Sequence, residues 1–95
     1  MQTEFFEWDD AKAEANLKKH KISFPEATTV FEDPYVLIES DELHSKDELR
    51  AFATGFSARS RVLLVVYAER RERIRLIGAR KANMAERRKY ESRFE

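Results

Sequence analysis

An unbroken apolar run from Val62 to Tyr67 is the feature that most constrains this chain. Its apolar residues occupy both parities, which is typical of a strand with both faces covered by other elements. A chain of 95 residues rarely holds two cores, so we expect a single domain over residues 1–95, built around this strand. The chain contains no cysteine, so no disulfide framework and no cysteine-bearing metal site is expected.

The segments on either side of this run predict an α+β fold. The expected elements are, in order, a strand at 5–8, helices at 10–20 and 23–32, strands at 36–39, 49–57, 61–69 and 73–81, and a helix from residue 83. Asn83 and Glu86 have the spacing of a capping box at the start of this last helix. Ala13, Leu17 and His20 form the expected buried stripe of the first helix. Residues 40–48 are polar and acidic and predict a mobile surface loop. This order indicates an N-terminal strand and two helices packed on an antiparallel sheet, followed by a C-terminal helix.

The charge is divided unevenly along the chain, although the formal net charge is zero. Residues 1–57 carry 6 basic and 13 acidic side chains, whereas residues 58–95 carry 12 basic and 5 acidic ones. Ten of those twelve basic residues are arginines, whose planar guanidinium pairs with phosphate through two hydrogen bonds. The second part therefore predicts a surface that attracts polyanions, with a solvated surface paired to the acidic half as the alternative.

The basic residues gather around the strand at 73–81 and the helix after it. By strict alternation, Arg73, Arg75 and Lys81 share one face of that strand while Arg80 points to the other. Tyr67 and Glu69 on the neighbouring strand would add an aromatic ring and a carboxylate base. The alternatives are that the cations form the solvated side of an edge strand and that the tyrosine belongs to the core.

No Gly-rich phosphate loop, HExxH pair, CxxC pair or GxSxG elbow occurs in the chain. The remaining Arg, Lys, Glu, His and Tyr side chains suit RNA cleavage without a metal or cofactor, which needs a base, an acid and cations around phosphorus. His44 lies in the acidic loop and is a candidate for proton transfer or a surface residue. His20 ends a helix, where a role at the helix dipole is the simpler interpretation.

The chain resembles the BrnT toxin family over nearly its whole length. The residues that carry the resemblance are Phe6–Asp9, Asn16–His20, Ser23–Ala27, His44 and Ser45 with Glu48 and Arg50, and Ile74–Ala82 with Glu86, Arg87 and Tyr90. The matching positions imply a functional set of His20, His44, Arg75, Arg80, Lys81, Glu86, Arg87 and Tyr90. The turn at 69–73 departs from the pattern because it lacks the glycine expected there, and Gly78 stands where serine is usual.

The resemblance implies a RelE-like fold and a metal-independent ribonuclease toxin that inhibits translation as half of a type II toxin–antitoxin pair. It implies neutralisation by a BrnA-type antitoxin with a ribbon-helix-helix part, through which operator DNA is contacted indirectly. A homodimer and a 2:2 complex with the antitoxin both remain open.

We assign the residues to two roles on this basis. Arg80, Lys81, Glu69 and His44 are the predicted catalytic residues, and Arg73, Arg75, Arg87, Arg88 and Tyr90 are the predicted RNA-binding residues. Alanine at Arg80 is expected to raise the barrier by about 3 kcal/mol if its guanidinium contacts the developing charge.

The competing hypothesis is a noncatalytic module that binds nucleic acid or a partner protein through the same basic face. It predicts binding without strand scission. No apolar run approaches the roughly 20 residues that cross a bilayer, and acidic residues stand where a secretory signal would be basic. The sequence therefore predicts a cytoplasmic protein with no membrane partner.

Overall fold

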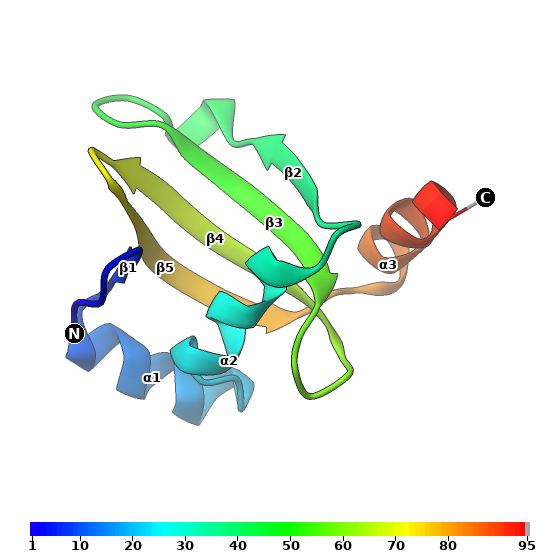
Figure 1. Cartoon of the computed structure of the whole chain (residues 1–95), viewed down its shortest axis with the longest axis horizontal. Coiled ribbons are helices and arrows are strands. Elements are labelled where there is room, and N and C mark those ends of the chain that lie inside the picture. The colour runs from blue at the N-terminus through cyan, green and yellow to red at the C-terminus, as the bar shows by residue number, and fades with distance from the viewer. Residues whose placement is uncertain (95) are drawn as a thin grey trace.

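The structure, a computed structural model, describes residues 1–94 and contains one five-stranded sheet with three α-helices (Figure 1). The elements in order are β1 (Phe6–Glu7), α1 (Asp10–His20), α2 (Phe24–Thr28), β2 (Leu37–Ser40), β3 (Arg50–Phe56), β4 (Val62–Arg70), β5 (Arg73–Lys81) and α3 (Met84–Glu91). Short 3₁₀ helices follow α2 at Thr29–Glu32, precede β3 at Glu42–His44 and end the described chain at Ser92–Phe94. None of the described helices combines the length and apolarity that crossing a membrane requires.

The strands are arranged in the order β1-β5-β4-β3-β2. Strands β2 to β5 are antiparallel neighbours, as expected, whereas β1 joins the free side of β5 in parallel. The sheet is therefore mixed, because β1 and β5 form one parallel pair beside three antiparallel ones, and three strands lie between β1 and β5 along the chain. The α+β class and the terminal helix are confirmed, and β4 lies at the centre of the sheet, as its apolar run predicted.

One face of the sheet is covered by α1, α2 and the 3₁₀ turn after α2, and the main core lies between them (Figure 1). Side chains of β4 at odd positions, such as Leu63 and Val65, enter this core together with Phe24 and Trp8. The rings of Trp8 and Phe24 meet edge to face, with centroids 5.8 Å apart. We call this side of the sheet the helix face.

The buried stripe of α1 differs from the one expected. Leu17 is 48% exposed, whereas the neighbouring Asn16 is buried. The Asn16 amide nitrogen donates to the carbonyls of Ile22 at 3.0 Å and Ala79 at 2.8 Å, and its oxygen accepts from the Ala79 amide at 3.1 Å. Asn16 therefore acts in place of a neighbouring strand along the part of β5 that β1 does not cover.

The second half of β5 is displaced by one residue relative to β4. Val66 pairs with Gly78, yet the next residue, Tyr67, pairs with Leu76, so Ile77 is an extra residue on β5. Such a β-bulge reverses the alternation of side chains beyond it. Arg80 consequently lies opposite Leu64, and Lys81 lies opposite Leu63.

Candidate nucleic-acid interface

The face of the sheet opposite the helix face carries a group of arginines. Arg75 pairs with Ala68 and Arg73 pairs with Arg70, while Arg50 also pairs with Ala68 from the other side. All of these β4 partners are at even positions, opposite in direction to the core residues of the same strand. We define the arginine face by Arg50, Arg70, Arg73, Arg75 and Arg80.

The expected division of the β5 cations is wrong because of the bulge. Arg80 shares a face with Arg73 and Arg75, since its partner Leu64 is at an even position. Lys81 is exposed on the helix-face side of the strand, opposite the core residue Leu63. The structure thus brings Arg80 into the group and leaves Lys81 out of it.

Helix α3 covers one end of the arginine face and binds Arg80 through a salt bridge. The Arg80 guanidinium donates two hydrogen bonds to the Glu86 carboxylate, at 2.7 and 2.8 Å. Glu86 also completes the capping box with Asn83 at the start of α3, as the sequence predicted. Hydrogen bonding from Arg80 lowers the pKa of Glu86, against the opposing effect of burial. Arg80 is therefore anchored to α3 in this structure.

Two more arginines of the face are paired with carboxylates. Arg75 Nη1 lies 2.9 Å from Glu7 Oε2 on β1, and Arg70 Nε lies 2.7 Å from Glu48 Oε2. Arg73 instead donates from Nε to the backbone oxygen of Thr3 at 2.8 Å. These contacts fix the guanidinium groups on the sheet, and phosphate would have to compete with them.

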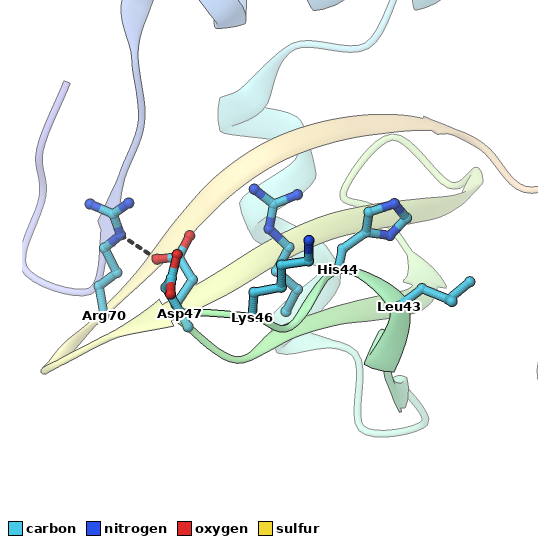
Figure 2. Close-up of a pocket in the computed structure, with 7 residues that line it drawn as sticks. Leu43, His44, Lys46, Asp47 and Arg70 are labelled. Carbon is cyan, nitrogen blue, oxygen red and sulfur yellow. Dashed lines mark hydrogen bonds and ion pairs between the residues drawn. The ribbon is translucent and has the colours of Figure 1, made fainter.

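A surface hollow of about 420 Å³ lies beside this face, where the 40–48 segment meets β3 (Figure 2). Its lining residues are Leu43, His44, Lys46, Asp47, Glu48, Arg50 and Arg70. Arg70, which forms an ion pair with Glu48, lies at one end of it (Figure 2). We call this hollow the rim pocket, and its volume lies in the range of small-ligand sites.

His44 is oriented at the rim pocket by a buried carboxylate. Its Nδ1 lies 2.9 and 3.1 Å from the two carboxylate oxygens of Asp41, a residue only 7% exposed. The His44 side chain itself is 63% exposed. A carboxylate on Nδ1 favours the tautomer with a proton on Nδ1 and leaves Nε2 free as a base.

The segment at 40–48, expected to be a mobile loop, is held to the start of β3. The Ser45 hydroxyl donates to the Asp41 carbonyl at 2.6 Å and accepts from the Arg50 amide at 3.0 Å. The Asp41 amide donates to the Arg50 carbonyl at 2.9 Å. These bonds place His44 and Arg50 at one pocket.

Glu69 and Tyr67 do share a face, as expected, but it is the helix face. Tyr67 is 3% exposed and packs edge to face against Phe31, with ring centroids 5.1 Å apart. Glu69 is exposed opposite Ile74, on the side of the sheet away from the arginine face. The structure therefore does not bring Glu69 together with Arg80 or His44.

Tyr90 is not available to RNA in this structure, which corrects its expected role. It is fully buried, its hydroxyl donates to Asp33, and its ring packs against Phe56 and Phe94. Burial and the bond to Asp33 raise the pKa of Tyr90 above its usual range. Its role is to attach α3 to the sheet.

The remaining cations of α3 are at the surface. Arg87 and Arg88 are exposed, and Arg87 pairs with Glu91 at 3.4 Å. His20 lies at the end of α1, beside Lys19 and away from the rim pocket. Within residues 1–94, no group of three or more His, Asp or Glu side chains is placed to hold a metal ion.

Three residues of this interface were missed from the sequence. Asp41 is hydrogen-bonded to His44, and Arg50 lines the rim pocket together with His44. Phe52 is half-buried and lies next to Val66 on the arginine face. The three-residue spacing of Asp41 and His44 was the available signal for the pair. Phe52 lies within the strand expected at 49–57, and an aromatic ring on a basic face suits base stacking.

Comparisons with known proteins agree with this architecture. A family model described as the ribonuclease toxin BrnT of type II toxin–antitoxin systems matches residues 8–86. The 1.1 Å crystal structure of the Brucella abortus ribonuclease toxin BrnT superposes with a TM-score of 0.66, at 19% identity, over 86% of this chain and 100% of that one. No curated protein sequence matches the chain. Because the family model spans most of its length, the chain belongs to the BrnT family of ribonuclease toxins of type II toxin–antitoxin systems.

Proposed function

We propose that this toxin binds single-stranded RNA on the arginine face and cleaves it by acid–base chemistry without a metal ion. The observation that carries the proposal is the placement of Arg73, Arg75 and Arg80 along one face of the sheet, with His44 at its rim. Guanidinium groups can hold the charge that develops on phosphorus, which is the role a metal ion has in other nucleases.

The spacing of the face suits a nucleotide chain. Arg50 and Arg75 both pair with Ala68, so they stand two strand spacings apart, about 10 Å. Phe52 lies in the next cross-strand row and offers a half-buried ring to an unstacked base. Arg87 and Arg88 extend the basic surface onto α3.

The proposed reaction uses the RNA's own 2′-hydroxyl. A base takes its proton, the 2′-oxygen bonds to phosphorus, the bond from phosphorus to the 5′-oxygen breaks, and that oxygen leaves with a proton from water. The products are a 2′,3′-cyclic phosphate and a 5′-hydroxyl. His44 is placed to act as the base through Nε2.

As a toxin of a type II system, the protein has an antitoxin partner and an RNA target. We propose that the antitoxin is of the BrnA type, with a ribbon-helix-helix part that contacts operator DNA. We further propose that cleavage takes place in the cytoplasm and inhibits translation. A homodimer and a 2:2 assembly with the antitoxin predict different masses in light scattering of the purified complex.

Partner-free protein and naked RNA in EDTA provide the direct test, with product ends mapped. Arg80→Ala should lower kcat/KM for cleavage about a hundredfold, equivalent to about 3 kcal/mol of RNA binding and reaction barrier together. Arg59→Ala is the matched control, because Arg59 is exposed in the turn between β3 and β4 and belongs to neither the face nor the pocket.

The outcomes separate the proposal from its competitor. Cleavage in EDTA that requires Arg80 supports a metal-independent ribonuclease. Intact RNA that is nevertheless bound, together with normal growth on expression, supports the noncatalytic binding module. Intact naked RNA combined with growth arrest and cleaved cellular RNA points to cleavage on the ribosome.

A further inference from the structure

Arg50 differs from the other arginines of the arginine face in having no partner for its guanidinium. Arg70, Arg75 and Arg80 are each bound to a carboxylate, and Arg73 to a backbone oxygen. Among residues 1–94, no hydrogen bond or ion pair to the Arg50 guanidinium is present. Phosphate can therefore bind Arg50 without displacing an existing carboxylate.

The pairing of Asp41 with His44 has the arrangement of an oriented base. Asp41 is buried, both of its carboxylate oxygens contact His44 Nδ1, and the imidazole side chain is otherwise largely exposed. A buried carboxylate needs a hydrogen-bond donor, and the Nδ1–H group of His44 is the side-chain donor here. The geometry fixes the ring and directs Nε2 away from Asp41.

Ser45 connects these two features. Its hydroxyl bridges the Asp41 carbonyl and the Arg50 amide, and the Asp41 amide bonds to the Arg50 carbonyl. His44 and Arg50 both line the rim pocket. Asp41, His44 and Arg50 are thus linked by hydrogen bonds into one unit. Because Arg50 is the first residue of β3, this unit is anchored to the sheet.

We propose that Arg50 is a catalytic residue of this ribonuclease, and that Asp41 is a positioning residue that orients His44 beside it. The inference rests on the proposed function and places the scissile phosphate in the rim pocket. Arg80, which lies four β4 residues away from the row of Arg50, then binds a flanking phosphate and not the reacting one. His44 Nε2 takes the 2′-hydroxyl proton there, while Arg50 holds the oxygens of phosphorus as negative charge builds up on them. Arg75 pairs with Ala68 from β5, as Arg50 does from β3, and would hold a neighbouring phosphate.

Asp41 acts through the orientation of His44, so its role should be visible in the rate of cleavage rather than in RNA binding. Asp41→Asn should lower the single-turnover rate about tenfold while the KM for RNA stays near its wild-type value. Asp41→Glu, which keeps the carboxylate, should recover part of the rate.

The test measures single-turnover cleavage of a defined RNA by the full chain. Arg50→Gln should lower the rate about 10²-fold or more, as loss of a donor to a developing oxyanion does, and Arg50→Lys should recover part of it. Added guanidinium at concentrations well below those that unfold the protein should restore activity to Arg50→Ala. His44→Gln should lower the rate about 10²-fold, and an RNA with 2′-deoxyribose at the cleavage position should stay intact.

Arg59→Gln is the matched control and should cleave like wild type, and thermal unfolding confirms that each variant is folded. Wild-type rates in Arg50→Gln, or loss of activity that neither lysine nor guanidinium restores in a folded protein, would overturn the role of Arg50. A wild-type rate in folded Asp41→Asn, or a rate that Asp41→Glu does not recover in part, would overturn the role of Asp41. A wild-type protein that cleaves no RNA, either purified or on expression in cells, refutes the proposed function and this inference with it.

Discussion

Replacing Asn16 with alanine would test whether its side-chain amide satisfies the backbone of β5 where β1 does not pair with it. The Asn16 amide makes three hydrogen bonds to backbone groups, two of them to Ala79. Alanine leaves the Ala79 amide and carbonyl and the Ile22 carbonyl without that partner. Because Asn16 is only 9% exposed, water replaces these bonds poorly.

The magnitude follows from the bonds lost. Each contributes about 1 kcal/mol net, so three amount to about 3 kcal/mol. Alanine favours the helix over asparagine by about 0.6 kcal/mol, which reduces the expected loss of unfolding free energy to about 2.5 kcal/mol. In a domain of this size that corresponds to a fall in Tm of about 10–20 °C.

Urea and thermal unfolding followed by circular dichroism measure this loss. Leu17→Ala is the matched control on the adjacent position, and its 48% exposure predicts a change below about 0.5 kcal/mol. If Leu17→Ala proves more destabilising than Asn16→Ala, then the helix packs in the orientation that its apolar residues suggested, and the argument from Asn16 is refuted.

Three further changes have outcomes that the structure specifies. Glu26→Gln should cost about 2–3 kcal/mol at neutral pH, because it breaks hydrogen bonds from Arg61 and Ser57 to a carboxylate that is 4% exposed. The hydrogen bond from Arg61 lowers the pKa of Glu26 in the folded state, so the wild type should lose this stability as pH falls below the ordinary glutamate pKa of 4.5, whereas the variant should not. Urea unfolding of both proteins at neutral and acidic pH measures the difference, and an equal pH dependence would contradict the role of the Glu26–Arg61 pair. Tyr90→Phe should keep the ring contacts but lose the bond to Asp33, at a cost of about 1.5–3 kcal/mol in thermal unfolding; an unchanged Tm would show that α3 is attached by other contacts. Arg71→Gly should stabilise the fold by about 0.5–1 kcal/mol, because Arg71 has a φ of 54°, which glycine adopts without strain, and a lower Tm would contradict this.

The central strand and the start of α3 could be predicted because each depends on local information. An apolar run at both parities specifies a strand covered on both sides, and Asn83 with Glu86 specifies a helix cap. Arg73–Lys81 was also placed correctly as a strand. The direction of its side chains was not, because alternation assumes continuous pairing and nothing at Ile77 marks the bulge.

The candidate site was only partly predictable, because part of it depends on the bulge and part on contacts between a loop and β3. Counting along β5 placed Arg73 and Arg75 on one face, but the same count put Arg80 on the other face and Lys81 in its place. Asp41, His44 and Arg50 are brought together by hydrogen bonds through Ser45, in a segment without any apolar period. Contacts of that kind depend on how the loop meets β3, and the acidic composition of the loop suggested mobility instead.

The bulge at Ile77 makes β5 two half-strands that are out of phase with each other. Leu76 and Ala79 can both stay in the core while Arg75 and Arg80 both reach the opposite face, which an unbroken strand does not allow at these spacings. If β5 kept its length but lost the bulge, regular alternation would turn either Arg80 toward the helix face or Ala79 out of the core. Deleting Ile77 would instead leave every other side chain of β5 on its present face, because Leu76 and Gly78 would then pair with Tyr67 and Val66 in succession. A related chain with a single-residue gap at this position would therefore present the same basic surface on an unbroken strand.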